Sequence, residues 1–534
     1  MQRLTVSTSG AASDAVRRHL PPLVSDGVAG KLFAKDHTLW GEAAEEESSK
    51  RLGWTDAHDV SRPLVDEVLA LRDEFLANGV DRVVLCGMGG SSLAPEVIAR
   101  TAGVALTVLD STDPAQVAAA LADRLERTAV VVSSKSGSTI ETDSQRRAFE
   151  AAFREAGIDP ASRIVVVTDP GSPLEAASRA AGYRVFLADA TVGGRFSALT
   201  AFGLVPTGLA GVNVAALLDE ARAAADVLAV DADENPGLVL GAAIAGGEPI
   251  KTYLGIVSDT TSIEGFGDWA EQLIAESTGK DGRGLLPVVL PIDAPEIGAT
   301  LPDLQVARLV ADAADTPAVG DEIAVSGPLG AQLLLWEVAV AVAGRIIGIN
   351  PYDQPDVESA KLAARGLLDE QPAPTPAAFA EGGIEARGTD DVVEGRTTVA
   401  SAVDALLAAL PEGGYVSVQA YADRTRLMVL EALRDLLAER SRRPVTFGWG
   451  PRFLHSTGQF HKGGPKVGVF LQLTSKEDID IEVPERPFSF GSLIAAQATG
   501  DAQVLEAHGR PVLRLELTSP DRDATALLEL LRAI

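Results

Sequence analysis

The chain has 534 residues, of which 46% are hydrophobic and 23% charged, as in a globular protein with room for roughly two to four domains. Lysine and arginine number 46 against 75 aspartate and glutamate residues, so the formal net charge is −29. This charge argues against nucleic acid or an anionic membrane as the main partner. The single cysteine, Cys86, is expected to be a buried packing residue, and it excludes an intramolecular disulfide and a cysteine-based zinc cluster.

The sequence also gives an expectation about location. We find no apolar run long enough to cross a bilayer and no basic–apolar leader at the start of the sequence. With the lone cysteine, these features favour a cytoplasmic protein with no membrane partner.

Residues 1–60 are predicted to be a mostly helical, peripheral segment. A helix at 62–78 then leads into short apolar runs that alternate with alanine-rich helical segments. Such an alternation indicates a parallel, doubly wound sheet, which binds ligands beyond the carboxyl ends of its strands. The strands predicted here are 82–86, 105–109, 128–132, 163–167 and 184–187.

The α/β pattern continues to the end of the sequence, with a Pro/Ala-rich linker or exposed crossing at 369–380. We therefore predict two doubly wound domains followed by an α/β extension: a first domain at 61–230, a second at 231–368 and a C-terminal region at 381–534. The further predicted strands are 252–257, 286–292, 322–325, 414–418, 444–448, 467–473 and 512–517, with helices at about 328–346 and 423–440.

Two glycine- and serine-rich loops directly follow predicted strands. VVSSKSGSTIET (131–142) places five hydroxyl residues around Lys135 and Gly137, just before a helical segment. Hydroxyls and free amides at the start of a helix can bind a doubly charged oxyanion, although serine and threonine are also ordinary capping residues. GMGGSSLAP (87–95) is a second loop of this kind, which favours the phosphate-binding interpretation. The hydroxyl residues of the first loop are Ser133, Ser134, Ser136, Ser138 and Thr139.

A candidate general base lies in the second half of the sequence. WAEQLIAESTGK (269–280) places Glu276 near the end of an amphipathic helix, before a glycine-containing turn. A carboxylate there can point into a cleft and act as a base if its pKa is tuned by its surroundings; the alternative is a solvated surface glutamate. Glu271 lies five residues earlier on another face of the helix, so it is no obvious substitute.

Five motifs, in the same order, resemble those of the glucose-6-phosphate isomerase family. GMGGSSLAP (87–95) is similar to the first glycine-rich loop of that family, and SSKSGSTIET (133–142) to its phosphate-binding loop. GGRFS (193–197) is similar to its arginine motif, EQLIAESTGK (271–280) to its catalytic-glutamate motif and INPYDQPDVESAK (349–361) to its glutamine–lysine motif. The resemblance implies two sugar-isomerase (SIS) domains with the active site between them.

The resemblance also implies a reaction and the residues that perform it. A phosphorylated hexose would undergo reversible aldose–ketose isomerisation through a cis-enediol, with no metal or cofactor. Glu276 would move the proton between C2 and C1, and Arg195 would stabilise the developing enediolate. Gln354 and Lys361 would contact the substrate, with Lys361 helping at the ring oxygen. The phosphate would be held by Ser134, Lys135, Ser136, Ser138 and Thr139, and the sugar approached by Gly90 and Ser91.

The sequence departs from the family pattern at the ring-opening histidine. No histidine occurs between His58 and His455, so the nearest counterpart is FLHSTGQFHKGGP (453–465), which comes after Lys361. His461 is our first choice for this role and His455 the second. In the family this histidine comes from the partner subunit, so the resemblance implies a homodimer.

The glycine at position 137 is a second departure, because the usual enzyme loop carries a bulky residue there. It leaves open a wider pocket and activity on mannose 6-phosphate as well. A different class of function also stays open, namely a sugar-phosphate sensor that regulates a partner without chemistry. Glu276 and Arg195 favour the enzyme, since a sensor needs the phosphate loop but no base.

Overall fold

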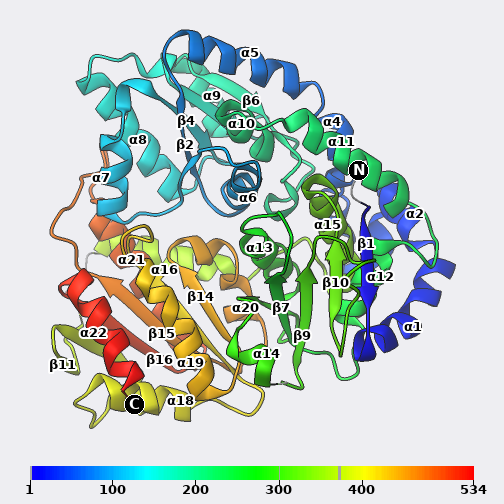
Figure 1. The fold of residues 1–534 in the computed structure, drawn as a ribbon. Helices are drawn as coiled ribbons and strands as arrows, with labels where there is room; N and C mark the ends of the chain where they lie inside the picture. The colour runs from blue at the N-terminus through cyan, green and yellow to red at the C-terminus, as the bar shows by residue number, and fades with distance from the viewer. Residues whose placement is uncertain (1–2, 300, 371–374, 534) are drawn as a thin grey trace.

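The computed structural model describes residues 3–299, 301–370 and 375–533, and these residues form three β-sheets (Figure 1). Each sheet and the helices packed on it are called a unit here, numbered along the chain. The first unit contains the sheet β3-β2-β4-β5-β6, in which all neighbouring strands are parallel. The predicted doubly wound sheet is thus confirmed. Its strands are β2 (Arg82–Gly87), β3 (Thr107–Leu109), β4 (Thr128–Ser133), β5 (Ile164–Thr168) and β6 (Arg184–Leu187).

Both faces of the first sheet are covered, as the apolar strands require. Along β2, Val84 and Cys86 pack on one side with side chains of α7 and α8, while Val83 and Leu85 pack on the other with those of α5 and α10. Successive side chains of a strand point to opposite faces, so a strand between two helical layers is apolar throughout. The predicted burial of Cys86 is confirmed. The helices of this unit include α5 (Leu64–Ala77), α6 (Leu93–Thr101), α7 (Pro114–Ala122), α8 (Ile140–Glu155), α9 (Pro173–Ala180) and α10 (Ala201–Ala210).

The second unit contains the sheet β1-β10-β9-β7-β8. Four strands are parallel, but β1 joins the edge antiparallel to β10, so the N-terminal segment supplies a strand as well as helices. The apolar pattern of the sequence predicts neither β1 nor β9, where Gln305 and Arg308 interrupt the apolar run. The strands are β1 (Thr5–Thr8), β7 (Tyr253–Ser258), β8 (Leu286–Leu290), β9 (Leu304–Leu309) and β10 (Ile323–Ser326).

Helix α15 (Leu329–Ile347) forms the centre of the second unit and packs against α11, α12 and α13. It is long and apolar enough to cross a membrane by length and composition, so the expectation that no such run exists was wrong. Its most apolar window is 89% buried inside the protein, as in the core helix of a folded domain. Because α11 packs against α15, it belongs to the second unit, although the predicted boundary at residue 230 placed it in the first. The helices here are α1 (Gly10–Ser25), α2 (Val28–Phe33), α3 (Glu45–Ser48), α4 (Ala57–Val60), α11 (Val214–Leu228), α12 (Pro236–Ala245), α13 (Phe266–Thr278) and α14 (Pro295–Ala299).

The third unit contains the sheet β11-β12-β16-β15-β13-β14. Its last four strands are parallel, which confirms the α/β extension, and β12 and β11 add an antiparallel edge. The predicted helix at 423–440 begins later, because the Asp423 carboxylate accepts hydrogen bonds from the amides of Thr425 and Arg426 and holds a turn. The strands are β11 (Phe379–Glu381), β12 (Ile384–Gly388), β13 (Tyr415–Tyr421), β14 (Val445–Trp449), β15 (Gly468–Ser475) and β16 (Val512–Leu517).

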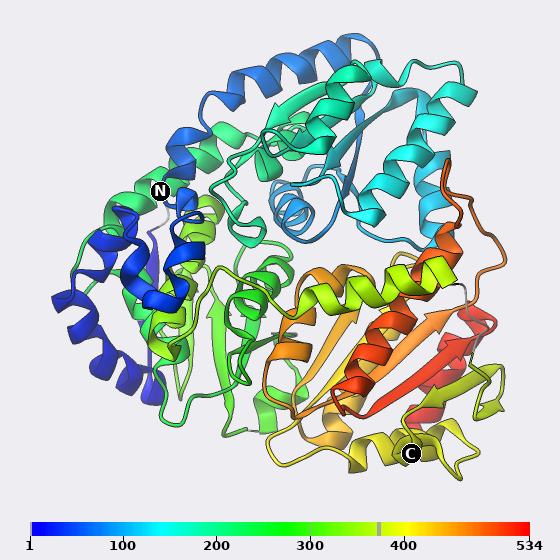
Figure 2. The same ribbon diagram turned by 180° about the vertical axis from the view of Figure 1, so that it is seen from behind.

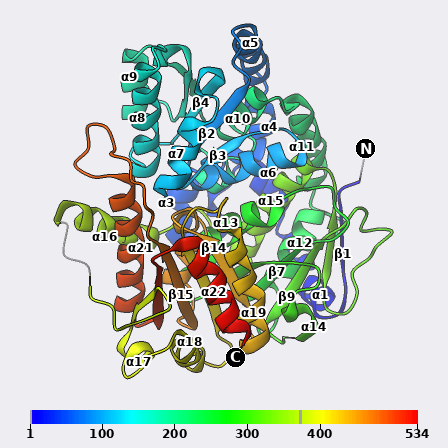
Figure 3. The same ribbon diagram turned by 60° about the vertical axis from the view of Figure 1, so that its left-hand side comes forward.

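The three units surround a common centre (Figures 1 and 2). Helix α16 (Val357–Glu370) follows the second unit in sequence but packs against α21 (Phe490–Ala507) of the third, and Figure 3 shows the two helices together. Of the predicted linker at 369–380, residues 371–374 lie outside the described residues. The remaining helices are α17 (Asp390–Val393), α18 (Val399–Ala408), α19 (Leu433–Ser441), α20 (Gly458–Gly463) and α22 (Pro520–Arg532).

Candidate functional site

A cavity of about 220 Å³ lies where the three units meet, and the expected motifs converge on it. The first unit contributes both glycine- and serine-rich loops, the second unit contributes α13, and the third contributes the segment after β14. Every side chain expected at the site lines this cavity except Ser138 and His461. The expected residues that do line it are Gly90, Ser91, Ser134, Lys135, Ser136, Thr139, Arg195, Glu276, Gln354, Lys361 and His455.

Glu276 lies in the last turn of α13 and is only 8% exposed, so it is no solvated surface glutamate. The turn after it is fixed, because Gly279 packs against the backbone of Phe460 and leaves no room for a side chain. Burial raises the pKa of Glu276, and Arg195, His455 and a hydrogen bond from Gln272 limit the rise. A carboxylate with a raised pKa in a cavity is suited to act as a general base.

Arg195 is the centre of the polar contacts around that carboxylate. Its Nη1 lies 3.3 Å from Glu276 Oε2 and donates to Gln354 Oε1 at 2.7 Å, and its Nε donates to Ser277 Oγ at 2.8 Å. Its Nη2 donates to the carbonyls of Pro351 and Asp353. The guanidinium is therefore held by groups on two sides while it remains beside the candidate base.

Gly90 allows two loops of the first unit to pack closely at the cavity. A side chain at Gly90 would collide with the carbonyl oxygen of Gly194, so the glycine-rich loop packs directly on the GGRFS loop. Gly89 has a φ of +56°, a left-handed conformation that favours glycine. Glycine at position 90 is therefore required by this close packing, and the residue also lies in the cavity wall.

The hydroxyl-rich loop ends at the start of α8, whose N-cap residue is Thr139. The Thr139 side chain makes no capping hydrogen bond with α8, so the first amides of this 16-residue helix are left without that partner. Ser134 Oγ contacts Thr139 Oγ1 at 3.3 Å and accepts from the amide of Gly137 at 3.1 Å. The loop thus presents hydroxyls and a helix N-terminus to the cavity, which is a suitable surface for an oxyanion.

Gly137 and Ser138 lie outside the cavity wall. Gly137 has a φ of +75° and packs against Leu174, so the loop conformation explains this glycine. Ser138 is exposed and its Oγ lies 2.6 Å from that of Ser136. Because Gly137 does not line the cavity, the structure gives no support to a pocket widened by this residue.

The structure places His455, and not His461, in the cavity. His455 lies in the 3₁₀ helix η9 (Arg452–His455), with Nε2 at 3.1 Å from Glu141 Oε1, and Gln497 Nε2 donates to the same oxygen at 2.7 Å. His461 lies 2.8 Å from the Tyr415 hydroxyl through Nδ1 and is 1% exposed in the core of the third unit. Burial lowers the pKa of His461 well below its usual value. His461, our first choice for the ring-opening histidine, therefore does not line the cavity, and His455, our second choice, replaces it.

Gln354 and Lys361 reach the cavity from the segment that leads into α16. Gln354 is held by Arg195, as described above, whereas the Lys361 side chain is 40% exposed and lies 3.8 Å from Glu358. The α16 helix is tied to the third unit near its start, because Gln459 accepts from the amide of Asp356 and donates to its carboxylate. In the TGQFH sequence, it is therefore Gln459, and not His461, that contacts segments next to the site, namely Asp356 and the carbonyl of Gly279.

Several residues in or behind the cavity wall were not predicted from the sequence. Gln272 precedes Glu276 by one helical turn, so the helix period could have identified it. Glu141 does not line the cavity but contacts His455 from behind, and as part of the hydroxyl-rich motif it could have been suspected as the partner of a histidine. Arg51 comes from the segment before the first unit, and no pattern in the sequence marks it or Tyr352.

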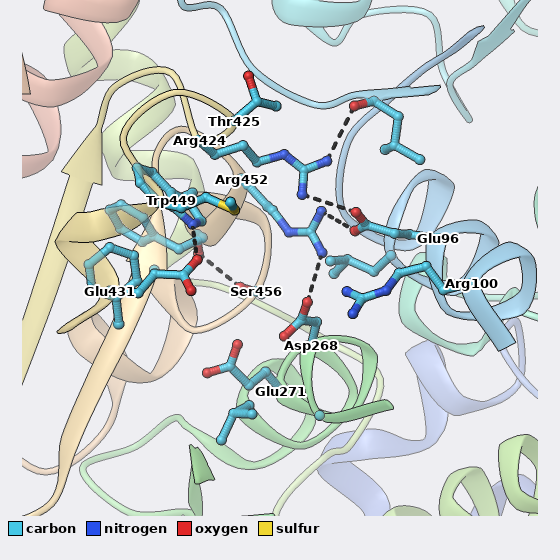
Figure 4. Close-up of a pocket in the computed structure, with 18 of the residues that line it drawn as sticks. Glu96, Arg100, Asp268, Glu271, Arg424, Thr425, Glu431, Trp449, Arg452 and Ser456 are labelled. Atoms are coloured by element: carbon cyan, nitrogen blue, oxygen red, sulfur yellow. Dashed lines mark hydrogen bonds and ion pairs between the residues drawn. The ribbon is translucent and has the colours of Figure 1, made fainter. Parts of the chain in front are cut away.

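A larger cavity of about 1270 Å³ is lined by α6 and by residues of α13 and η9 other than those that line the smaller cavity (Figure 4). Its centre is occupied by Arg424 and Arg452 of the third unit. Arg452 contacts Glu96 at 2.5 Å, Asp110 at 2.6 Å and Asp268 at 3.4 Å. Burial alone would raise the pKa of Glu96, but Arg452 and Arg424 lower it to about 2. These ion pairs join the third unit to the other two, beside the helix that carries His455.

Comparison with known proteins places the chain among sugar-phosphate isomerases. It is 30% identical over 364 residues to a probable glucose-6-phosphate isomerase of Haloarcula marismortui, covering 58% of this chain and 80% of the relative. It is 32% identical over 339 residues to a probable glucose-6-phosphate isomerase of Natronomonas pharaonis, covering 54% of this chain and 79% of the relative. No family model matches the chain.

Among solved structures, the chain is similar to a hypothetical protein of Thermus thermophilus. The TM-score is 0.58 at 25% identity, and the match covers 68% of this chain and all of that protein. The match therefore leaves about a third of this chain outside it.

Proposed function

The chain belongs to the glucose-6-phosphate isomerase family, and on this premise we propose that it interconverts glucose 6-phosphate and fructose 6-phosphate through a cis-enediol. One observation carries the proposal: Glu276 and Arg195 lie 3.3 Å apart in the same cavity as the hydroxyl-rich loop. A phosphosugar anchored at the loop would present its reacting carbons to the base. The sugar-phosphate isomerase activity itself follows from the family.

The proton transfer uses Glu276 and Arg195. Glu276 takes the proton from C2, and the electron pair of that bond moves to form the enediolate, whose charge develops on the oxygens of C1 and C2. The Arg195 guanidinium is a fixed cation beside the base, so it stabilises this charge without reorganisation. The hydroxyl proton of the C2 oxygen passes to the C1 oxygen, and the same carboxyl group returns the carbon-bound proton to C1, which leaves the carbonyl at C2. Tight anchoring of the Arg195 guanidinium by Ser277 and two backbone carbonyls keeps it in place.

His455 and Lys361 are the groups available for opening the sugar ring. The buried Glu141 carboxylate lies 3.1 Å from His455 Nε2 and orients the imidazole, as a general acid–base group requires. Lys361 lies near enough to Glu276 to lower the pKa of that carboxyl, so its charge is at the reacting end of the cavity. We propose that His455 and Lys361 act together at the ring oxygen when the sugar ring opens.

All of these groups come from one chain. The third unit supplies His455 in cis, so the proposed site needs no residue of a second copy. The homodimer, the cytoplasmic location, a part in glycolysis and gluconeogenesis, and additional activity on mannose 6-phosphate stay predictions. The sensor alternative predicts binding of the phosphosugar without turnover.

A coupled assay tests the proposal. Purified protein is given fructose 6-phosphate, and glucose 6-phosphate is measured with a dehydrogenase. We expect turnover that survives EDTA, because the proposed chemistry needs only a base, a fixed cation and an acid–base pair. Loss of activity in EDTA that a divalent ion restores would overturn the metal-independent mechanism. Phosphosugar binding without turnover would support the sensor instead.

A further inference from the structure

The ammonium group of Lys135, the lysine of the hydroxyl-rich loop, is paired with other groups of the first unit. Lys135 Nζ donates to the carbonyl of Val192 at 2.6 Å and forms an ion pair with Asp169 at 3.0 Å. Burial lowers the pKa of Lys135, and Asp169 opposes this effect. The ammonium therefore fastens the loop to its own unit, so the charge of Lys135 is already paired although the residue lines the cavity.

Arg51 supplies a positive charge at the same end of the cavity. Its Nε donates to Glu47 at 2.7 Å and its Nη1 to the carbonyl of Ala190 at 3.4 Å, while Nη2 has no hydrogen-bond partner among the residues that the structure describes. The side chain is 29% exposed and lines the cavity, as do Ser134 and Ser136. It is thus held in place at one edge and open to a ligand at the other.

The backbone around Arg51 is fixed to the segment that precedes the arginine motif. Leu52 forms a β-bridge with Val192, and the amide of Gly53 donates to the carbonyl of Thr191 at 3.2 Å. A side chain at Gly53 would collide with that of Thr191. One short stretch, 190–192, therefore contacts Arg51, accepts from Lys135 and leads into Arg195.

The cations of the cavity divide between its two ends. Lys361 acts electrostatically on Glu276 and Glu141, at the reacting end, whereas Arg51 acts on Lys135, at the loop end. Because the 190–192 segment accepts from both Arg51 and Lys135 and Arg51 lines the cavity, we propose that Arg51 binds the phosphate group of the substrate and so helps to select phosphorylated sugars. The proposal rests on the proposed function, since it places a phosphosugar in this cavity. A guanidinium can form two parallel hydrogen bonds with a phosphate, which a neutral hydroxyl cannot.

Replacement of Arg51 by methionine tests the proposal. Removal of a charge-assisted hydrogen bond is expected to raise KM for fructose 6-phosphate about 10-fold or more. The kcat should change little, because the phosphate does not react. Inhibition by inorganic phosphate should weaken by a similar factor, and Arg51→Lys should recover part of the loss.

Two variants separate binding from local structure. Lys50→Met removes the neighbouring cation, which pairs with Glu46 at 2.9 Å and does not line the cavity, so KM should stay at the wild-type value. Glu47→Gln removes the partner of Arg51 but keeps the guanidinium, so KM should not rise. If Glu47→Gln raises KM as much as Arg51→Met, Arg51 acts through the fold and the proposal is overturned.

The readouts also separate this proposal from the proposed function. Unchanged KM and unchanged phosphate inhibition in an active Arg51→Met enzyme would overturn the role of Arg51 alone. If the wild-type protein fails to isomerise fructose 6-phosphate, calorimetric titration with inorganic phosphate replaces the kinetic readout. Phosphate binding that Arg51→Met weakens would then support the role of Arg51 although the proposed function had failed, and equal binding by both proteins would overturn it.

Discussion

The two cavities on either side of α13 differ in how their charged groups are paired. In the smaller cavity, Glu276 lies next to a guanidinium that is also held by neutral groups, and Lys361 is only loosely paired. In the larger cavity, Arg452 is surrounded by the carboxylates of Glu96, Asp110 and Asp268. Ion pairs that satisfy each other hold units together, whereas groups left available to a ligand can perform chemistry.

The helix α13 makes this contrast testable within one element. Gln272 and Glu276 face the smaller cavity, while Asp268 and Glu271 face the larger one, as Figure 4 shows for the latter pair. Burial raises the pKa of both Glu271 and Glu276. A raised pKa alone therefore does not identify the base, and neither does the size of a cavity. What distinguishes Glu276 is its position beside Arg195, His455 and the hydroxyl-rich loop.

The largest expected effect is that of Glu276→Gln, which keeps size and hydrogen bonding but removes the base. General-base contributions are typically about 10²–10⁴-fold, so kcat should fall by at least that range. KM should change little, because the phosphate loop belongs to the first unit. Glu271→Gln is the matched control on the other face of α13 and should keep kcat. Equal losses in the two variants would show that the loss comes from damage to α13.

The second prediction compares the two histidines. His455→Gln should lower kcat about 10²-fold with the cyclic substrate, the lower end of acid–base effects, since Lys361 remains at the ring. His461→Gln removes buried hydrogen bonds to Tyr415 and Ser417, so it should lower Tm while the folded enzyme keeps its kcat. Steady-state kinetics below the unfolding transition would check both. A folded His461 variant with the greater loss of kcat would reverse our assignment.

The third prediction concerns the phosphate loop. Ser134→Ala and Thr139→Ala each remove a hydrogen bond to a charged group, worth about 1.5–3 kcal/mol, so KM should rise about 10-fold or more. Ser138→Ala is the control, because Ser138 is exposed and does not line the cavity. A large fall in kcat with unchanged KM would contradict the anchoring role.

The smallest effect is a shift in pH dependence. Glu276 is active as a carboxylate, so kcat/KM should fall as the pH drops through its raised pKa. The hydrogen bond from Gln272 lowers that pKa, and Gln272→Leu removes it. The acid limb of the pH profile should therefore move to higher pH in this variant. An acid limb that stays in place or moves to lower pH would show that another group controls it.

Local sequence patterns predicted the parts of the fold that depend on local chemistry. The parallel strands of the first sheet and the loops after β2 and β4 were found because their apolar runs and glycine–serine clusters lie close together in sequence. Strands β1 and β12 were not predicted because they are short and become strands through their antiparallel pairing with β10 and β16, which lie far along the chain. Strand β9 was not predicted because it contains the charged Arg308, whose guanidinium pairs with Glu322 just before β10.

The same distinction holds for the site. Glu276, Arg195 and the hydroxyls lie in motifs whose local spacing carries the signal. The choice between His455 and His461 depended on how the backbone of residues 450–457 turns between β14 and α20, and only the structure places His455 beside Glu141. The backbone beside Arg51 is fixed by a β-bridge between Leu52 and Val192, far along the chain, so the sequence around Arg51 carries no sign of the contact.

The most direct test of the account follows the C2 proton of glucose 6-phosphate in deuterium oxide. Proton magnetic resonance measures its exchange with wild-type protein, Glu276→Gln and Glu271→Gln. If Glu276 is the base, exchange should be lost in Glu276→Gln and kept at the wild-type rate in Glu271→Gln. Exchange at a near wild-type rate in Glu276→Gln would show that another group removes the proton, even though the fold and the family assignment would stand.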